Sequence, residues 1–507
     1  MFASSPSSLK SCILVAFLIG GLAPPAWTQQ PAERPPERPA AAAQPQGSVL
    51  RLLPPDAVSE KEIEIGGRKL AYTATAGTLS LYGQDGERTA AVFYTAYTVK
   101  NEPNRPVTFA FNGGPGAASA YLHLGLVGPR ILEFGPDGRS GAAARLRDNP
   151  QSWLAFTDLV LIDPVGSGWS RPAKADGGGN FWGVRRDAES MAKIVALYVT
   201  KNSRHASRKY LLGESYGGFR AAKVARNLQR DQGIVVSGIV MVSPFIEGGF
   251  QFGGEKFALG AALHFPALVA SEMERKGAFN QDKLAEAERF ALTDYLTMLA
   301  GPPPTGPAAE FLYAKIALLT GLPADLVAKS RGFVRDAYLQ HLRSSENKIA
   351  SRYDGGITVD DPFPERGGHG TDPVLDGFSR ALAGGFVAYA RDELGFKTEM
   401  TYTLLSGEVN GRWNWGEDGG RSAVSASDDL RVLLALEPTF RLLIQHGYSD
   451  LATPYGVSRY VLDHLPPIGA PDRAQLKLYR GGHMAYFSEE SRRAMTADAQ
   501  AFYEQNR

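Results

Sequence analysis

Short apolar runs, each ending in a glycine-rich or polar loop, alternate with amphipathic stretches between residues 106 and 245. The runs are PVTFAF before NGGPG, TDLVLI before DPVGSG, KYLL before GESYGG and GIVMV before SPF. Residues 187–200 and 219–230 instead repeat apolar positions at helical spacing. This alternation predicts an α/β fold with a mostly parallel central sheet and helices on both faces. Ligand sites in such sheets lie at the carboxyl ends of the strands, where all four loops fall.

Different patterns flank this region on both sides. Before it, KEIEIGGRKLAYTATAGTLSLYG and TAAVFYTAYTV alternate with period two around turns, which predicts antiparallel strands. After it, residues 246–425 carry helical patterns broken by Pro- and Gly-rich loops, and the strand pattern then resumes in TFRLLIQHG and AQLKLYRGG. We therefore expect a core in two parts, residues 48–245 and 426–507, separated by a largely helical cap insertion over residues 246–425.

The first 47 residues lack the pattern of a folded domain. Lys10, the apolar stretch from Ile13 to Leu22 and the small residues after it have the layout of a secretory signal peptide, predicted as residues 1–28. An uncleaved membrane anchor or a buried strand is the alternative, but an apolar core of about 10 residues is short for a membrane span. Residues 29–47 are rich in Pro, Ala and Gln, cannot bury enough apolar surface to fold, and are predicted to be a disordered tether.

Cysteine content and charge restrict the location and the partners. The sole cysteine, Cys12, lies in the predicted signal peptide, so the mature fold cannot depend on disulfides. Export of such a chain favours a bacterial periplasm or exterior, and no later segment has the length and apolarity of a membrane helix. The chain has 44% hydrophobic residues for a core, and its net charge of +1 without a Lys/Arg block argues against nucleic acid. The oligomeric state stays open.

The loop GESYGG holds a candidate nucleophile. Ser215 stands in a G-x-S-x-G pattern between a predicted strand and a predicted helix, which places its hydroxyl on a strained turn. Side chains at Gly213 and Gly217 would collide at that turn. A serine hydroxyl is a poor nucleophile until a base takes its proton, so a histidine and an orienting acid are required. The pattern alone is weak, because a serine between glycines is common.

Asp450 and His483 are the candidates for the acid and the base. In this architecture the order along the chain is Ser, then Asp or Glu, then His, each after a strand. Asp450 follows TFRLLIQHG, and His483 follows AQLKLYR and two glycines. The alternatives are a turn or helix-cap aspartate and a surface histidine. His446 is a rival base, but it precedes Asp450 by four residues and is in the wrong order.

The loop FNGGPG is the candidate source of an oxyanion hole. Its small residues expose backbone N–H groups, and Gly114 is the predicted donor beside the N–H of Tyr216. The alternative is a plain Gly-Pro turn. Glu408, His369 and Asp360-Asp361 show no arrangement typical of a metal site, so we expect neither a metal nor another cofactor.

These motifs resemble those of the serine carboxypeptidase family of α/β-hydrolases. The shared pieces, in family order, are NGGPG from Asn112, Gly128-Pro129, NPQSW from Asn149, DPVGSGWS from Asp163, GESYGG from Gly213, GYSD ending at Asp450 and GGHM containing His483. They cover Val107 to the C-terminus, with a diverged insertion in the expected place. The resemblance is to a bacterial, exported member and implies Ser215 as nucleophile, His483 as base and Asp450 as its orienting acid. It also implies Gly114 and Tyr216 as the oxyanion hole.

In that family the glutamate before the nucleophile helps to hold the free C-terminal carboxylate of the substrate, with an asparagine and a second glutamate. The resemblance implies this role for Glu214 and Asn112, with a raised glutamate pKa that suits acidic conditions. Leu126 stands in place of the second glutamate and offers no hydrogen bond. Ala110 and Ala117 replace a family tryptophan and cysteine. The alternative is that Glu214 caps the following helix or hydrogen-bonds nearby backbone.

The sequence thus predicts an exported serine-type hydrolase that cleaves peptide bonds through an acyl-enzyme, a carboxypeptidase that releases C-terminal residues. Its expected partner is a peptide or acyl substrate. An esterase or acyltransferase on the same scaffold is the first alternative, since the family includes acyltransferases. A non-catalytic exported binding protein is the second. Trp413 and Trp415 of the insertion either line the acyl pocket or belong to the core.

Overall fold

The structure is a computed structural model and describes residues 48–102, 104–366, 371–416 and 420–505. The predicted signal peptide, the predicted tether and His369 lie outside these residues. Within them, no helix is both long and apolar enough to cross a membrane.

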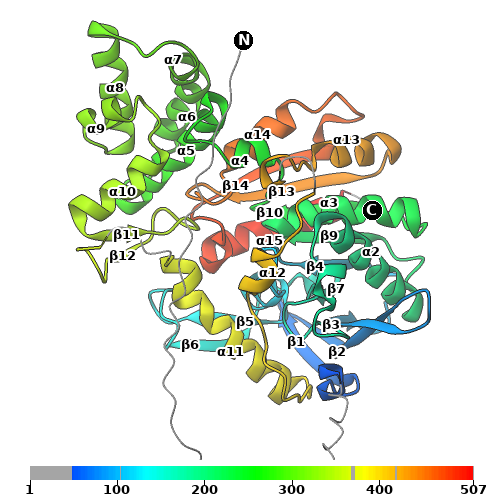
Figure 1. Cartoon of the computed structure of the whole chain (residues 1–507). Helices are drawn as coiled ribbons and strands as arrows, with labels where there is room; N and C mark the ends of the chain where they lie inside the picture. Colours follow the sequence, from blue (N-terminus) through cyan, green and yellow to red (C-terminus); the bar gives the residue numbers. More distant parts are fainter. Residues whose placement is uncertain (1–47, 103, 367–370, 417–419, 506–507) are drawn as a thin grey trace, which may run out of the picture. The chain divides into compact units, whose positions relative to one another are not determined.

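A 10-stranded sheet runs through the centre of the described chain (Figure 1). Its path in space is β1 (Ala57–Ile65), β2 (Arg68–Tyr82), β3 (Arg88–Val99), β7 (Asp158–Ile162), β4 (Val107–Phe111), β9 (Lys209–Glu214), β10 (Gly238–Val242), β13 (Arg441–Gly447) and β14 (Ala474–Tyr479), with β8 (Arg171–Pro172) beside β3. Pairing is antiparallel from β1 to β7 and parallel from β7 to β14. Strands β4, β7, β9 and β10 are buried at every position, as continuous apolar runs between two helical layers require. The predicted α/β-hydrolase fold with a mostly parallel sheet is confirmed.

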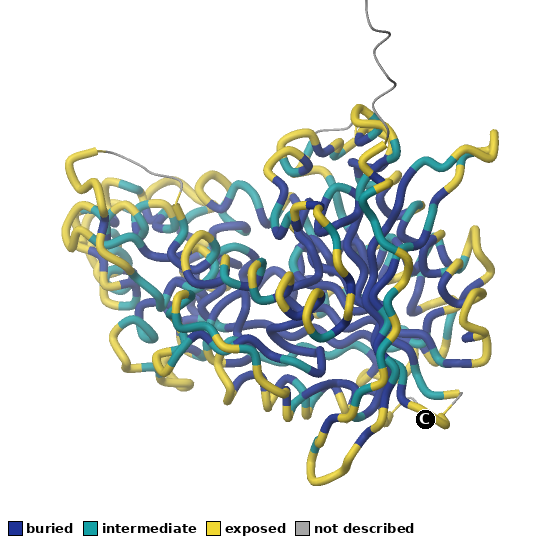
Figure 2. Tube along the Cα trace, turned by 90° about the horizontal axis from the view of Figure 1, so that it is seen from below, coloured by how far each residue is buried: buried dark blue, intermediate teal, exposed yellow. Residues whose placement is uncertain are grey.

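Alternate side chains of the central strands point into two separate hydrophobic clusters. Phe109 of β4 and Leu211 of β9 belong to one cluster, whereas the next residues, Ala110 and Leu212, belong to the other. The helices in the first cluster include α2 (Val184–Lys201), α3 (Tyr216–Asp231) and α13 (Ser427–Leu436), and those in the second include α11 (Ala381–Ala388) and α15 (Glu489–Glu504). The side-chain period of two in a strand produces this division. Figure 2 shows that the buried residues gather at the centre of the described chain.

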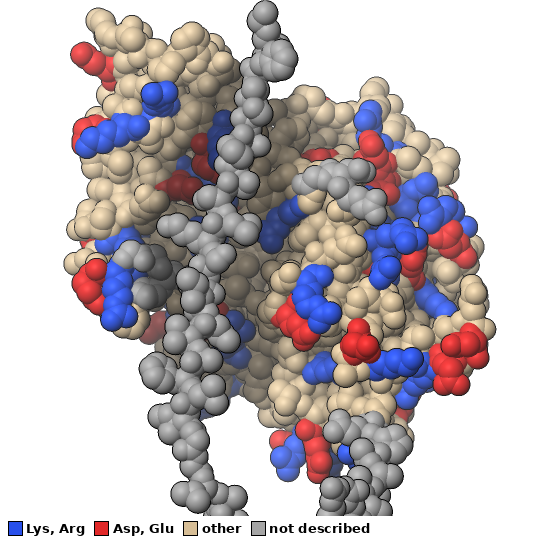
Figure 3. All heavy atoms as spheres, viewed as in Figure 1, with Lys and Arg blue, Asp and Glu red and all other residues tan. Residues whose placement is uncertain are grey.

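The predicted cap insertion packs in two different ways. Its first half forms a helical lobe with a hydrophobic cluster of its own (Figure 1). The lobe contains α5 (Ala258–Arg275), α6 (Gln281–Phe290), α7 (Leu296–Ala300), α8 (Gly306–Thr320), α9 (Ala324–Lys329) and α10 (Arg335–Glu346), followed by the paired strands β11 (Lys348–Ala350) and β12 (Thr358–Asp360). Its second half returns to the sheet, where Phe396 and Tyr402 pack 5.2 and 4.9 Å from Trp169 between ring centroids. A recess with charged residues on its walls lies beside the lobe (Figure 3). The boundaries of the insertion stay a prediction.

The sequence pattern missed the hairpin of β5 (Arg130–Phe134) and β6 (Ala144–Asp148). Strand β6 reads ARLRD, has no fully buried residue and offers only two apolar positions, so its alternation is too short to mark a strand. The remaining helices are α1 (Ala120–Leu122), α4 (Gly248–Gln251), α12 (Gly407–Gly411) and α14 (Tyr455–Asp463). Short 3-10 or π turns span Val49–Leu52, His123–Val127, Trp153–Ala155, Gly177–Asn180, Ala291–Tyr295, Pro373–Gly377, Phe378–Arg380, Tyr389–Glu393, Gly420–Ser422, Pro471–Arg473 and Ala485–Phe487.

Candidate active site

Ser215 lies on the sharp turn between β9 and α3. Its φ is 60°, a left-handed conformation that is strained for a residue with a side chain. A Cβ on Gly213 would lie 1.9 Å from the Gly217 carbonyl oxygen, and a Cβ on Gly217 would lie 2.5 Å from the Phe111 carbonyl oxygen. The predicted reason for both glycines is therefore confirmed. The turn holds the hydroxyl at the carboxyl end of β9, in a half-buried position.

The structure brings Asp450 and His483 together at the ends of β13 and β14. His483 Nδ1 lies 2.8 Å from Asp450 Oδ2, and both residues are buried. Asp450 Oδ1 accepts hydrogen bonds of 2.9 Å from the backbone N–H groups of Ala452 and Thr453. Thr453 Oγ1 lies 2.8 Å from Asp450 Oδ2 and 3.0 Å from His483 Nδ1. The contact with Asp450 places the imidazole proton on Nδ1 and leaves Nε2 as the base.

The electrostatics of the two histidines are opposite. Burial lowers the pKa of His483, but the Asp450 carboxylate, with Glu214 and Asp372 behind it, raises the pKa above the usual histidine range. Burial lowers the pKa of the rival His446 to about 3, so it stays neutral. Its Nε2 lies 2.7 Å from Ser458 Oγ, and its Nδ1 is 4.0 Å from Asp450 Oδ2. His446 is therefore a buried, neutral side chain beside Asp450, and the assignment of His483 as the base stays a prediction.

Ser215 opens onto a cavity of about 250 Å³ that Gly114 and Tyr216 also line. Among the described residues, neither the Gly114 N–H nor the Tyr216 N–H has a hydrogen-bond acceptor. The two loops are in close contact, because a Cβ on Gly113 would lie 2.5 Å from the Tyr216 nitrogen. Two free N–H groups beside a nucleophile are the arrangement that stabilises a tetrahedral oxyanion. Their role as an oxyanion hole stays a prediction.

Glu214 and Asn112 lie side by side, but both are buried and neither lines the Ser215 cavity. Asn112 Nδ2 donates to Glu214 Oε2. The Tyr486 hydroxyl lies 2.9 and 3.0 Å from the two Glu214 carboxylate oxygens. These bonds go to side chains, and the first turn of α3 has no side-chain cap, so Glu214 does not cap that helix. Binding of a substrate carboxylate by this pair stays a prediction.

The environment of Glu214 favours its neutral form. Burial raises the pKa of Glu214 to about 7. His483 and the hydrogen bonds from Tyr486 and Asn112 act in the opposite direction, whereas Asp450 adds to the rise. Among the described residues, no lysine or arginine forms an ion pair with this carboxyl group. A proton therefore binds to Glu214 close to neutral pH.

Tyr486 is a site residue that the sequence reasoning missed. A Cβ on Gly125 would lie 2.4 Å from the Tyr486 ring, so the ring rests against the residue that precedes Leu126. Leu126 itself is fully buried. The tyrosine hydroxyl supplies a hydrogen bond to Glu214 that leucine cannot offer. No general rule relates Tyr486, three residues after His483, to Glu214, the residue before Ser215. The sequence therefore held no usable signal for this contact.

Asp354 is a second missed residue, and it joins the loops that carry the acid and the base. Its Oδ1 accepts a 2.7 Å bond from Ser449 Oγ, next to Asp450, and its Oδ2 accepts a 3.1 Å bond from the Gly482 N–H, next to His483. The neighbouring Tyr353 carbonyl accepts the His483 N–H at 2.5 Å. Removal from water raises the pKa of Asp354 to about 6. The residue lies in the predicted insertion, so only the folded chain brings it to the site.

The insertion also contributes aromatic walls. Trp413 and Trp415 meet the Tyr216 ring edge-on at centroid distances of 5.3 and 5.5 Å. Trp415 lines the Ser215 cavity, whereas Trp413 is buried behind it. Trp415 thus has the position predicted for a residue that lines the acyl pocket, and Trp413 has the position of a core residue. The role of Trp415 in binding an acyl group stays a prediction.

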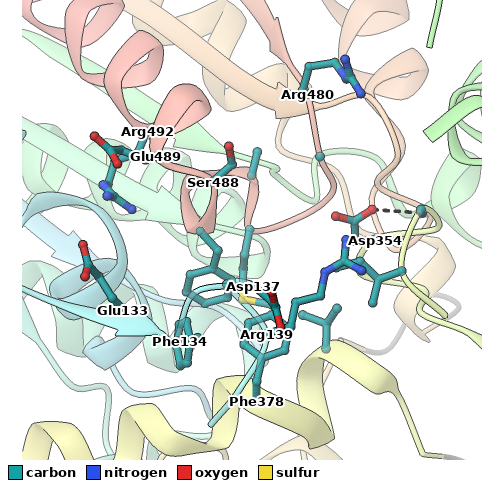
Figure 4. A pocket seen from close by; sticks show the side chains of 18 of the residues that line it. Glu133, Phe134, Asp137, Arg139, Asp354, Phe378, Arg480, Ser488, Glu489 and Arg492 are labelled. Atoms are coloured by element: carbon teal, nitrogen blue, oxygen red, sulfur yellow. Dashed lines mark hydrogen bonds between the residues drawn. The ribbon is translucent and has the colours of Figure 1, made fainter. Parts of the chain in front are cut away.

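A larger cavity of about 620 Å³ shares Tyr353 with the Ser215 cavity. The β5–β6 connection, the loop around Asp354 and residues 480–492 form its walls. Arg139 reaches from the β5–β6 connection towards the Asp354 carboxylate (Figure 4). Within the described ranges, no three His, Cys, Asp or Glu side chains gather in a way that could hold a metal ion.

Comparisons with known proteins find sequence similarity to one family. Residues 72–252 match a family model described as serine carboxypeptidase. Serine carboxypeptidase-like 44 of Arabidopsis thaliana is 29% identical over 163 residues, which are 32% of this chain and 32% of that protein. Serine carboxypeptidase-like 42 of the same plant is 30% identical over 135 residues, 26% of this chain and 27% of that protein. The chain thus matches about a third of the length of these curated relatives.

Solved structures resemble the chain more distantly. A crystal structure of VinJ is 15% identical with a TM-score of 0.40, over 85% of this chain and 99% of that one. A proline iminopeptidase from Mycobacterium smegmatis is 14% identical with a TM-score of 0.35, over 88% of this chain and 98% of that one.

Proposed function

Because residues 72–252 match the serine carboxypeptidase family model, we propose that the chain is a serine-type hydrolase that cleaves peptide bonds through an acyl-enzyme. The observation that carries the proposal is the 2.8 Å contact between His483 and Asp450 beside the cavity that holds Ser215. Thr453, whose hydroxyl lies 3.0 Å from His483 Nδ1, lines the same cavity as Ser215, so the oriented histidine and the hydroxyl on the strained turn belong to one site, as nucleophilic catalysis by serine requires.

The reaction follows from these positions. Ser215 Oγ attacks the substrate carbonyl while His483 Nε2 takes its proton, and Asp450 stabilises the imidazolium that forms. The N–H groups of Gly114 and Tyr216 hold the oxyanion. His483 then gives the proton to the leaving amine, and a water molecule, activated by the same base, hydrolyses the acyl-enzyme. No cofactor takes part in any of these steps.

Replacement of Ser215 by alanine tests the reaction. We expect the rate on peptides to fall by at least about a thousandfold while the unfolding transition is preserved, because the nucleophile lines a cavity and supports no core contact. Retained turnover in this variant would refute the assignment. A fluorophosphonate that labels the wild-type protein, but not the alanine variant, would exclude a non-catalytic binding protein.

We further propose that the enzyme is a carboxypeptidase, exported to the periplasm or the exterior, that releases C-terminal residues of peptides. The family resemblance at Asn112 and Glu214 supports this preference, and their contact within one cluster is consistent with it. Digestion of a mixed peptide pool at acidic and neutral pH, read by mass spectrometry, tests it. Stepwise loss of residues from C-termini is the expected result, and internal cleavage alone would contradict it.

One observation favours a second candidate, an esterase or acyltransferase of broader specificity. Both carboxylate oxygens of Glu214 already have partners in Asn112 and Tyr486, and Leu126 removes the second family glutamate. A blocked dipeptide and its C-terminal amide separate the two candidates. A carboxypeptidase cleaves the free acid faster, whereas equal rates on acid and amide, with faster cleavage of simple esters, indicate the broader enzyme.

A further inference from the structure

The cavity that holds Ser215 contains one charged side chain, Arg421, among the described residues that line it. The other walls are neutral, and many of them are aromatic, including Phe245, Phe252 and Trp415. A volume of about 250 Å³ is enough for one amino-acid side chain. The cavity can therefore select the residue whose carbonyl Ser215 attacks, and charge is the property that distinguishes its walls.

Two aromatic rings hold Arg421 in place. Its guanidinium carbon lies 4.8 Å from the centroid of the Phe252 ring and 5.3 Å from that of Trp415. Contact with two aromatic faces restricts a cation while leaving its N–H donors available. No Asp or Glu within the described ranges forms an ion pair with Arg421. Within the described part of the chain, these donors are thus available to bind an anion from outside.

Gln251 adds an acceptor to the same cavity. Its Nε2 donates to the Ala452 carbonyl, and its Oε1 is buried with no hydrogen-bond partner among the described residues. A buried acceptor without a partner is unfavourable, and a substrate N–H would satisfy it once the Gln251 side chain turns Oε1 towards the cavity. A carboxylate at Oε1 would be repelled, so an anionic group belongs at Arg421 and an amide N–H at Gln251.

We propose that this cavity selects acyl groups that carry a carboxylate, and that Arg421 is the residue that determines this specificity. The substrate class is an N-acylated acidic residue, Glu or Asp, immediately before the scissile bond. Its side-chain carboxylate binds the Arg421 guanidinium, and its N–H donates to Gln251 Oε1. The inference rests on the proposed function, because it assumes that the acyl group occupies the cavity next to Ser215.

A matched pair of substrates, blocked peptides and blocked α-esters of Glu and of Gln, tests the charge requirement. We expect kcat/KM for Glu to exceed that for Gln by roughly tenfold, as a charge-assisted hydrogen bond at a partly exposed site allows. R421Q should bring the ratio close to one, and R421E should invert it. Equal values for Glu and Gln in the wild-type enzyme would overturn the proposal.

Arg412 provides the matched control. It belongs to the same segment and also lies over an aromatic ring, with its guanidinium carbon 5.0 Å from the centroid of Trp182. It pairs with Glu408 at 2.7 Å and is not part of the cavity wall. R412Q should keep the wild-type preference for Glu, and a loss of preference in R412Q equal to that in R421Q would contradict a specific role for Arg421.

Binding to the S215A protein separates this inference from the proposed function, since it requires no turnover. N-acetylglutamate α-amide should bind roughly tenfold more tightly than N-acetylglutaminamide, and the difference should vanish in the double variant S215A/R421Q. Equal affinities for the two amides would overturn the inference even if the enzyme hydrolyses peptides. A preserved difference without any hydrolysis would refute the proposed function and leave the selective cavity intact.

Discussion

Replacing Glu214 by glutamine should remove a large pH-dependent term from the stability of the protein. The pKa of Glu214 rises from 4.5 to about 7 on folding, because the carboxyl group leaves water for a buried site. One pKa unit corresponds to about 1.4 kcal/mol, so holding the ionised group in this site costs about 3 kcal/mol. Glutamine keeps the shape of the side chain. Its oxygen can accept from Asn112, and its amide can donate to the Tyr486 hydroxyl.

The direction in which stability changes with pH follows from proton linkage. The folded state binds a proton at Glu214 more tightly than the unfolded state does, so this group stabilises the fold below pH 4.5, and the contribution is lost as pH rises through about 7. With these two pKa values, about 2.5 kcal/mol of the change falls between about pH 5 and about pH 8. The free energy of unfolding of the wild type should therefore fall by this amount relative to E214Q over the interval.

Urea unfolding of both proteins at several pH values measures this difference. Glu62, an exposed carboxylate on β1, supplies the control variant E62Q, which should follow the wild type because its side chain is 58% exposed. If E214Q and the wild type lose stability in parallel between about pH 5 and about pH 8, Glu214 is not the buried titrating group, and the reasoning is refuted. A second readout is the acid limb of kcat/KM. The Glu214 charge raises the pKa of His483, so E214Q should remain active to lower pH.

Three further variants test the surroundings of the site. Y486F removes a hydrogen bond that lowers the pKa of Glu214, so the midpoint of the stability change with pH should move upwards, and an unmoved midpoint would exclude the contact. In D354N an amide nitrogen replaces one carboxylate oxygen, so either the Ser449 hydroxyl or the Gly482 N–H loses its acceptor. We expect kcat to fall roughly tenfold with little change in KM, whereas a change in KM alone would argue against a positioning role. H446Q should cost about 1 kcal/mol of stability through its bond to Ser458 and leave the pH–rate profile unchanged; a shifted profile would make His446 part of the base.

The sheet and the order of its site loops were predictable because each central strand is a continuous apolar run that ends in a distinctive loop. Ser215, Asp450 and His483 follow β9, β13 and β14, and a mostly parallel sheet brings those three ends to one edge. The glycines at 213 and 217 were predictable for a steric reason that the turn confirms. Local pattern and general topology were sufficient for these residues.

Tyr486 and Asp354 were not predictable for a different reason. Each acts through a contact between segments that neither periodicity nor a short motif relates. Asp354 reaches the acid and base loops from the insertion, almost a hundred residues before Asp450, and its partners are a serine hydroxyl and a backbone N–H. Any polar residue of the insertion could have filled such a role. The hairpin β5–β6 was missed because three of the five residues of β6 are exposed and its alternation is too short to mark a strand.

The contacts of Glu214 and Arg421 together predict whether the enzyme is more selective for the acyl side or for the leaving side of its substrate. Asn112 and Tyr486 make the glutamate before the nucleophile a satisfied, buried group, so little of its binding capacity is left for a free carboxylate on the leaving side. Arg421 stands among neutral walls on the acyl side with its donors unpaired in the described chain. Binding energy comes from groups that the free protein leaves unsatisfied. We therefore expect a larger rate ratio between acidic and neutral acyl residues than between free-acid and amide leaving groups. The reverse order would show that a substrate displaces Tyr486 from Glu214.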